Sequence, residues 1–278
     1  MAARRGGCAF PILLIVFIGL VLTFDGEDEP RPLSPERPAF PEAPLPEDPP
    51  VIPRDGEHYG IDDPGPPRDS QGTAFALSRD GLWMTADHVV KGCSILGLAT
   101  AADRAERSER VIESAVSDAA LIADGLPSRA ALTLSGEPPV VEADGYHMGF
   151  PSGQAAVVHS RFIGQANAIR ASGANQPILA WAEIERFPAF DHSLGGISGG
   201  PTFDARGRVV GINSASSERR GRVLTTHPAQ MVNLVRASRT TPRPDVPMAI
   251  PDLRAAVARF EDLYRLGAIR QLFCEVVD

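Results

Sequence analysis

The sequence predicts an all-β core in residues 70–239, followed by a helix near the C-terminus. Short runs rich in Val, Ile, Ala and Thr recur through this region, and glycines separate them. This pattern favours antiparallel strands over repeated βαβ units. The region of about 170 residues is long enough for two small barrels that share one cleft.

The N-terminal segment, residues 1–25, is predicted to be a membrane anchor. Arg4 and Arg5 precede an uncharged apolar run of 17 residues from Cys8 to Phe24. This length is near the lower limit of about 17 residues for a membrane span, and it is long for the core of a signal peptide. Basic residues before the run and acidic residues after it predict that the rest of the chain lies outside the cytosol. A cleaved signal peptide is the alternative.

Residues 26–69 are predicted to form a linker. They contain 13 of the 26 prolines, interleaved with acidic residues. Proline removes backbone donors and charge opposes collapse, so this segment cannot build a packed core. It is expected to act as an extended stalk, and a disordered tail without mechanical role is the alternative.

The net charge of −8 has a local origin. Between Asp25 and Arg68, 12 acidic residues face four arginines, which accounts for the whole excess. The remainder is neutral and has no basic stripe, so we expect no nucleic-acid partner.

A hairpin is expected at the start of the core, with strands at 72–77 and 82–85 around a turn at 78–81. A short helical turn that carries His88 follows. Further along, Asp118 stands before the apolar run 119–123. Taken alone, each residue is more often structural than catalytic.

Ser198 lies in the stretch Gly195-Gly196-Ile197-Ser198-Gly199-Gly200-Pro201. A serine hydroxyl becomes a strong nucleophile only when a base accepts its proton and donors stabilise the oxyanion that forms. Glycines on both sides allow a tight turn that exposes the hydroxyl and its neighbouring N–H groups. The order His, Asp, Ser is the one used by chymotrypsin-type proteases and differs from that of lipases and subtilisins.

These motifs (Thr-Ala-x-His-Val-Val, Ser-Asp-x-Ala-Leu and Gly-x-Ser-Gly-Gly-Pro) resemble those of trypsin-like serine proteases, most closely the bacterial HtrA/Deg-type branch. The resemblance covers roughly residues 70–238. It implies two six-stranded β-barrels of the trypsin-like type and a triad of His88, Asp118 and Ser198. Asp87 is the alternative orienting acid, but neighbouring side chains diverge, so Asp118 is preferred.

The resemblance also implies the surroundings of the triad. The N–H groups of Gly196 and Ser198 are expected to form the oxyanion hole. The substrate-binding residues are expected to be His192, Asn213, Ser214, Ala215 and His227. The two histidines either face the P1 side chain, or point to solvent or bond a loop carbonyl.

Two departures from the family pattern stand out. Ile197 occupies the place where digestive proteases have an aspartate that pairs with a newly cut N-terminus, so we expect no activation by N-terminal cleavage. About 40 residues follow Val235, too few for the PDZ domain that many HtrA proteins carry.

Residues 240–278 are predicted to be a helical extension. Prolines break the first part, and Asp252 is expected to cap a helix. Its apolar face is expected to pack on the protease, with partner binding as the alternative; the face comprises Leu253, Val257, Phe260, Leu263, Tyr264 and Leu266. Cys93 and Cys274 are either disulfide-bonded, as a compartment outside the cytosol permits, or two buried free thiols. Cysteine and histidine spacings fit no metal site, so neither a metal nor a cofactor is expected.

The expected function is a serine endopeptidase that cleaves protein or peptide substrates through an acyl-enzyme. We expect it to be tethered to the bacterial inner membrane with its catalytic domain in the periplasm, or secreted there after signal cleavage. The rival is a catalytically silent, protease-like peptide-binding module. An esterase is disfavoured by the order of the triad. The oligomeric state stays open.

Overall fold

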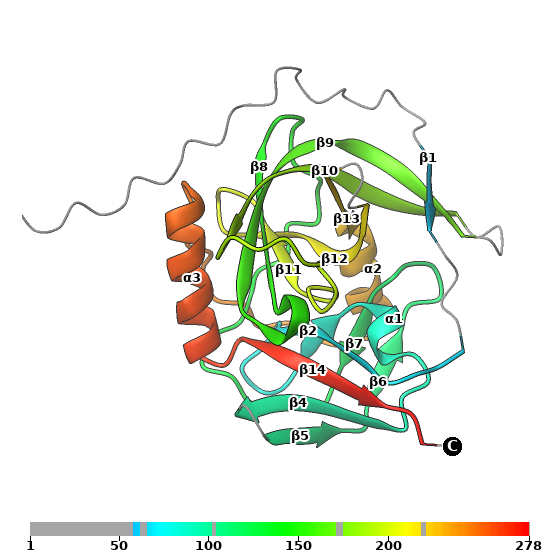
Figure 1. The fold of residues 1–278 in the computed structure, drawn as a ribbon. Helices are drawn as coiled ribbons and strands as arrows, with labels where there is room; N and C mark the ends of the chain where they lie inside the picture. The colour runs from blue at the N-terminus through cyan, green and yellow to red at the C-terminus, as the bar shows by residue number, and fades with distance from the viewer. Residues whose placement is uncertain (1–57, 62–65, 102–103, 171–174, 218–220, 278) are drawn as a thin grey trace, which may run out of the picture. The chain divides into compact units, whose positions relative to one another are not determined.

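The structure is a computed structural model of the chain, and it describes residues 58–61, 66–101, 104–170, 175–217 and 221–277. Two seven-stranded β-sheets form the framework of the described part of the chain (Figure 1). The predicted anchor at 1–25 and residues 26–57 and 62–65 of the predicted linker lie outside the described residues. In the part of the chain that is described, no helix has the length and apolarity needed to cross a bilayer.

One sheet closes into a barrel. Its strands are β8 (Asp144–Gly149), β9 (Ala156–Arg170), β10 (Asn175–Phe187), β11 (Pro201–Phe203), β12 (Val209–Ser217) and β13 (Arg222–Thr226). Strand β8 pairs with β9 on one side and with β11 on the other, which completes the circle. Strand β1 (His58–Ile61) adds to the outside of β9 in parallel. The predicted six-stranded barrel is confirmed for this half of the core.

The other sheet is open. Its order is β5-β4-β14-β2-β3-β7-β6, and its strands are β2 (Ser70–Ala76), β3 (Trp83–Thr85), β4 (Ile95–Ala101), β5 (Arg104–Ser108), β6 (Val111–Glu113), β7 (Ala120–Ile122) and β14 (Ile269–Glu275). Among the described residues, β5 and β6 do not pair, so the prediction of a second closed barrel is wrong. The edge strand β6 is only three residues long, which leaves few backbone groups for a closing pair.

The C-terminal segment contributes a strand as well as a helix. Helix α3 (Leu253–Arg265) begins at Asp252, whose carboxylate accepts the Ala255 N–H at 2.7 Å, as predicted. It packs on β8, β9 and β14 (Figure 1). Strand β14 then inserts between β2 and β4. The segment predicted to be purely helical therefore completes the open sheet.

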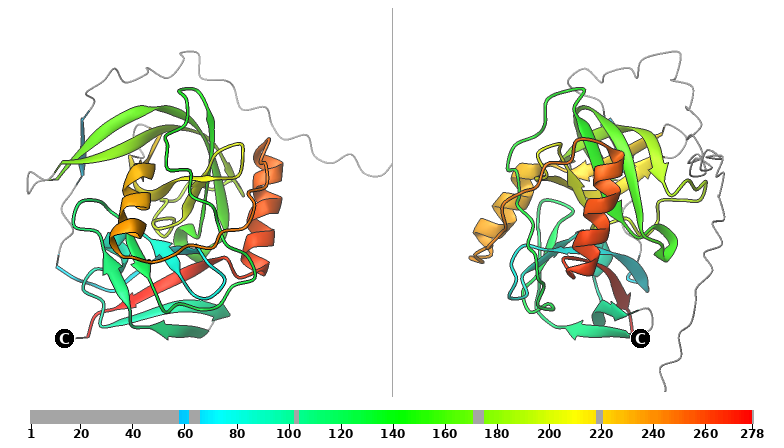
Figure 2. Two further views of the ribbon diagram at one scale, coloured as in Figure 1. Left: turned by 180° about the vertical axis from the view of Figure 1, so that it is seen from behind. Right: turned by 90° about the vertical axis from the view of Figure 1, so that its left-hand side faces the viewer.

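Besides α3, the described residues form two α-helices and one 3-10 turn. Helix α1 (Asp87–Val90) follows β3, so the predicted hairpin and helical turn are confirmed. A 3-10 turn, η1 (Pro151–Gly153), follows β8. Helix α2 (Pro228–Ala237) follows β13 and lies on a different side from α3 (Figure 2).

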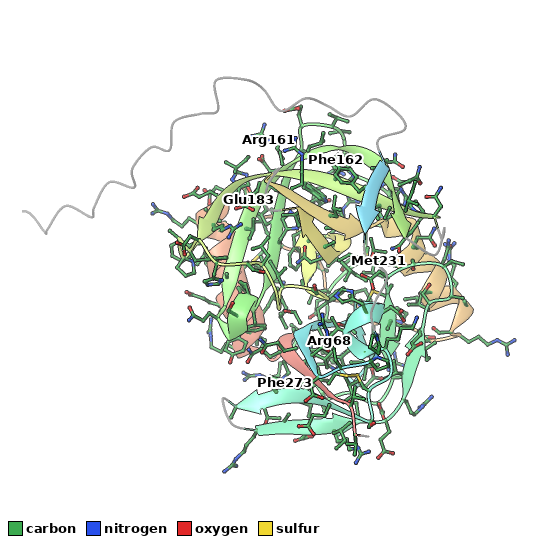
Figure 3. All side chains as sticks on the ribbon, turned by 45° about the vertical axis from the view of Figure 1, so that its right-hand side comes forward. Arg68, Arg161, Phe162, Glu183, Met231 and Phe273 are labelled. Atoms are coloured by element: carbon green, nitrogen blue, oxygen red, sulfur yellow. A yellow bond between two sulfur atoms is a disulfide. The ribbon has the colours of Figure 1, made fainter. Side chains whose placement is uncertain are left out.

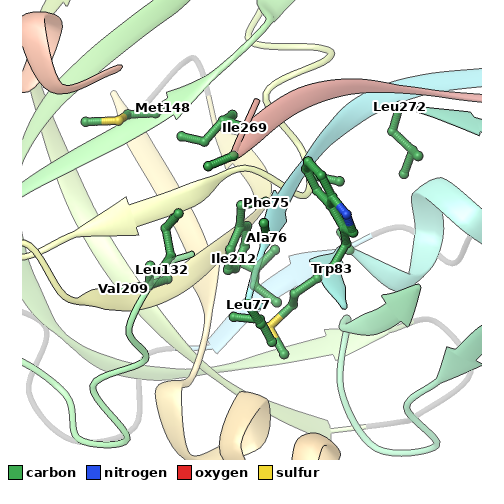
Figure 4. Close-up of a cluster of buried hydrophobic side chains, with 14 of the residues drawn as sticks. Phe75, Ala76, Leu77, Trp83, Leu132, Met148, Val209, Ile212, Ile269 and Leu272 are labelled. Atoms are coloured by element: carbon green, nitrogen blue, oxygen red, sulfur yellow. The ribbon is translucent and has the colours of Figure 1, made fainter. Parts of the chain in front are cut away.

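The largest hydrophobic core joins the two sheets. Phe75 and Trp83 from the open sheet, Ile212 from the barrel and Leu272 from β14 are all inaccessible to solvent (Figure 4). A second cluster fills the barrel around Phe162 and Trp181. Figure 3 shows Phe162 in the barrel, in the upper part of the view, and Phe273 in the open sheet, below it.

A disulfide links Cys93 to Cys274, with their Cα atoms 5.4 Å apart. Of the two alternatives for these cysteines, the bonded one is confirmed. The bond connects the segment after α1 to the end of β14.

Candidate active site

His88 is positioned by the short helix α1. Val89 and Val90, which follow it, are buried in the core and anchor the helix. Thr85, before the helix, is buried, and its hydroxyl donates to Thr73 O at 2.8 Å. The His88 side chain itself stays 32% exposed. Apolar packing thus fixes the backbone while the imidazole faces outward.

Asp118 contacts His88 through both carboxylate oxygens. Oδ1 accepts the His88 backbone N–H at 3.0 Å, and Oδ2 lies 2.8 Å from His88 Nδ1. The Ser214 hydroxyl also donates to Oδ2. Burial alone would raise the pKa of Asp118, but the His88 charge and these hydrogen bonds outweigh it and lower the pKa to about 2. The carboxylate is therefore ionised at neutral pH although its side chain is only 1% exposed.

Asp87, the alternative acid, lies in a different environment. Its Oδ1 is buried and has no hydrogen-bond partner among the described residues. Burial, together with the nearby charges of Glu113 and Asp118, raises the pKa of Asp87 to about 6. The acid that bonds the His88 ring is Asp118.

The backbone of Ser198 lies beside α1. Thr73 N–H donates to Ser198 O at 2.8 Å. A Cβ atom added at Gly72 would lie 2.7 Å from Val89 Cγ1 and 2.9 Å from Ser198 O. The Val89 side chain of α1 and the Ser198 carbonyl therefore both lie against Gly72. Residues 88, 118 and 198 are thus brought to the same region, from helix α1 and from the segments that precede β7 and β11.

Gly199 makes this approach possible. Its φ is +86°, and an added Cβ would lie 2.1 Å from Thr73 O and 2.2 Å from Thr85 Oγ1. Any larger residue would push the serine loop away from β2 and β3.

Four of the six backbone N–H groups in residues 195–200 have acceptors within the chain. Gly195, Ile197, Gly199 and Gly200 each donate their N–H to an oxygen of the chain. Within the described residues, the N–H groups of Gly196 and Ser198 donate to no acceptor. These are the two groups that the sequence predicted for an oxyanion hole.

The residues expected to bind substrate have different surroundings in the structure. The Ser214 hydroxyl bonds Asp118. Asn213 is buried, and its Oδ1 lies 2.7 Å from His147 Nδ1 and 2.9 Å from the Thr202 hydroxyl. Ala215, half-buried, packs against the small cluster around Tyr59. Ser214 therefore holds the Asp118 carboxylate, and Asn213 belongs to the buried side chains next to the site.

The two expected pocket histidines also have partners within the chain. His227 caps α2: its Nδ1 accepts the Ala229 N–H at 3.2 Å, and its Nε2 lies 3.1 Å from Gln165 Oε1. The His192 ring stacks on Phe190 at 4.4 Å, and its Nδ1 lies 3.0 Å from the Ser193 carbonyl oxygen. Both nitrogens of the His227 ring are thus engaged.

Sequence reasoning missed a buried polar network under the serine loop. His147 has no exposed surface; its Nε2 lies 2.6 Å from Ser160 Oγ and its Nδ1 2.8 Å from Thr202 Oγ1. Burial lowers the pKa of His147 to about 4, so the ring is neutral. Nothing in the local sequence marks this histidine, because its partners come from distant strands.

Comparison with known proteins agrees with this geometry. Residues 72–212 match the trypsin-like peptidase domain, so the chain belongs to the trypsin-like peptidase family. Within that family it resembles the HtrA/Deg-type serine endoproteases: it is 30% identical over 178 residues to a probable periplasmic serine endoprotease, DegP-like, of Halomonas elongata. The match covers 60% of this chain and 35% of that relative, so the chain spans about a third of the relative's length.

A solved protease structure shares the fold. The active form of the Rv3671c protease of M. tuberculosis superposes with a TM-score of 0.50 at 20% identity, over 76% of this chain and 99% of that one. The HtrA-type protease AlgW with a decapeptide gives a TM-score of 0.48 at 22% identity, over 60% of this chain and 50% of that one. The family and the curated relative indicate a serine endopeptidase, as the motifs predicted.

Proposed function

We propose that this endopeptidase cleaves peptide bonds with Ser198 as nucleophile, His88 as general base and Asp118 as the acid that orients His88. The observation that carries the proposal is the double contact of an ionised, buried Asp118 with His88, at 2.8 and 3.0 Å. With Nδ1–H donating to the carboxylate, Nε2 of the neutral ring holds the lone pair that a general base needs.

The reaction proceeds in two halves. Ser198 Oγ bonds to the scissile carbonyl carbon while its proton passes to His88 Nε2, and the N–H groups of Gly196 and Ser198 bind the oxyanion. The C–N bond then breaks, and His88 returns the proton to the leaving amine. Water attacks the acyl-enzyme ester, gives its proton to His88, and releases the acid as the proton returns to Ser198.

Strand β12 offers a place for the substrate backbone. Its pairing with β11 ends at Ile212, whereas its pairing with β13 continues to Ser217. Residues 214–217 therefore have one edge without a strand partner among the described residues. An extended peptide added to this edge would present its carbonyl groups to the serine loop. The P1 side chain would then lie between residues 192–194 and Ala215.

The proposed location is the periplasm, with the catalytic unit tethered by residues 8–24. Support comes from the charge pattern around the N-terminal apolar run. The Cys93–Cys274 disulfide supports an oxidising compartment. The DegP-like relative is itself named as periplasmic.

Covalent labelling tests the proposal. The purified full-length chain is expected to react with a fluorophosphonate probe, and Ser198→Ala is expected to abolish labelling without changing the melting temperature. Ser135→Ala, at a serine outside the serine loop whose hydroxyl donates to Glu137 O, is the control and should label like wild type. A wild-type chain that binds peptides but does not label would instead identify a silent binding module.

A further inference from the structure

The Gly195–Gly196 peptide is the part of the proposed oxyanion hole whose orientation the local sequence restrains least. Its N–H must point toward the developing charge before the reaction begins, because a donor that must reorient loses much of its effect. Glycine on both sides of the bond gives the peptide freedom to rotate. Gly196 has a φ of +104°, and an added Cβ would lie 2.5 Å from Phe150 O. A larger residue at this position, which would restrict rotation of the peptide, therefore does not fit.

The carbonyl of this peptide is anchored by the turn η1. Ser152 N–H donates to Gly195 O at 2.8 Å. The C=O and N–H of one trans peptide point in opposite directions. Anchoring Gly195 O on η1 therefore directs the Gly196 N–H away from the turn.

The next carbonyl is anchored by a side chain. Thr73 Oγ1 donates to Gly196 O at 2.9 Å and accepts the Phe150 N–H at 3.2 Å. Thr73 has no exposed surface, so no water replaces this hydroxyl if it is removed. One hydroxyl thus joins the serine loop to the turn.

The C-terminal segment supports the same turn. The Phe150 ring lies 5.5 Å from both Phe260 and Tyr264 of α3. Gln271, which pairs with Thr73 across β14 and β2, donates its side-chain amide to Gly153 O at 3.1 Å. The turn is therefore held from the side opposite the serine loop.

We propose that Thr73 is a positioning residue: its hydroxyl, with the turn 150–153 that α3 and β14 support, holds the Gly196 N–H in the orientation that binds the oxyanion. The inference rests on the proposed peptidase mechanism. It describes how the loop stays ordered where Ile197, 4% exposed, packs into the barrel core and makes no ion pair.

Two substitutions at one position test the role of the hydroxyl. Thr73→Val keeps the shape and removes the hydroxyl, whereas Thr73→Ser keeps the hydroxyl. With the full chain and a peptide substrate, Thr73→Val is expected to lower kcat about 10- to 100-fold with KM changed less than about threefold. Thr73→Ser should stay within about threefold of wild type in both constants.

The outcomes separate this inference from the proposed function. A wild-type chain that neither labels nor cleaves overturns the peptidase mechanism and the inference with it. An active wild type with an equally active Thr73→Val overturns the positioning role alone. A Thr73→Ser variant as slow as Thr73→Val shows that the methyl group, not the hydroxyl, is needed, and also overturns it.

A surface variant covers the case in which Thr73→Val does not fold. Tyr264 is 53% exposed, so its removal is not expected to unfold the chain. Tyr264→Ala should lower kcat about threefold at unchanged KM, because the Phe150 turn loses one of its two aromatic supports. Glu261→Ala, an exposed position on the same helix, is the control. Equal kcat in the two variants would contradict support of the loop by α3.

Discussion

At the scale of single residues, two aspartates near one histidine behave differently because of their donors. Asp118 receives hydrogen bonds from His88 and Ser214, which stabilise its charge although it is buried. The buried oxygen of Asp87 receives none from the described residues, and other carboxylates surround it. The His88 charge and these hydrogen bonds therefore determine which of the two acids has the low pKa and orients the base.

The raised pKa of Asp87 predicts a pH-dependent gain in stability for Asp87→Asn. Because the folded pKa of about 6 exceeds the ordinary value of 3.8, ionisation of Asp87 destabilises the folded state as pH rises from about 4 to 6. Solvent screens this partly exposed group, so the free energy of unfolding of the variant should exceed that of wild type by about 1 kcal/mol at pH 7, which corresponds to a few degrees in Tm. At pH 4 the two chains should be equally stable.

Thermal unfolding at the two pH values measures this effect. Asp191→Asn, at an exposed position, serves as the control and should leave Tm unchanged at both. A Tm difference of the same size at pH 4 and pH 7 would argue against ionisation of Asp87 as the cause.

At the scale of secondary-structure elements, the C-terminal strand is part of the core. Strand β14 pairs with β2 and β4 on its two sides. Ile269 and Leu272 have no exposed surface and join the core cluster that contains Phe75 and Trp83 (Figure 4). Without β14, the open sheet would divide into a two-stranded piece and a four-stranded piece.

Truncation tests the importance of this strand. A chain that ends at Arg239 is expected to lose cooperative thermal unfolding and fluorophosphonate labelling, because it exposes β2 and β4 and removes buried side chains from the core. A chain that ends at Glu275 keeps all of β14 and should unfold like wild type. Normal labelling by the shorter chain would show that β14 is dispensable.

At the scale of the whole described unit, one covalent bond closes a long stretch of chain. Cys93 and Cys274 are 181 residues apart in sequence, and the loop that the bond closes contains every strand from β4 to β13. Chain-entropy arguments assign larger stabilisation to longer loops, although native contacts modify the effect. The bond also ties the end of β14, the strand that supports the turn 150–153, to the segment that follows α1.

Removal of this bond is expected to lower stability more than activity. In a Cys8→Ser background, which leaves one cysteine pair, replacing Cys93 and Cys274 by Ser should lower the free energy of unfolding by about 2–5 kcal/mol. Equilibrium urea unfolding of the parent and the variant measures the difference. Peptidase activity at 25 °C should persist, since the bond does not contact the triad. Identical urea midpoints would show that the bond contributes nothing.

The sequence by itself predicted the chemistry and the local elements. The hairpin with its helical turn and the Asp252 cap depend on neighbours in the chain, and they appear as expected. The motifs around residues 88, 118 and 198 also indicated the family, because nucleophile, base and acid require particular residue types at particular spacings.

The tertiary structure alone decided how these parts are supported. That β14 fills the centre of the open sheet, that His227 caps a helix, and that Thr73 and Ser152 hold the serine loop all depend on partners far away in the chain. The sequence around Thr73 or around β14 does not indicate which distant residues these segments contact. The physical reason is that hydrogen bonds and packing form between segments that only the folded chain brings together.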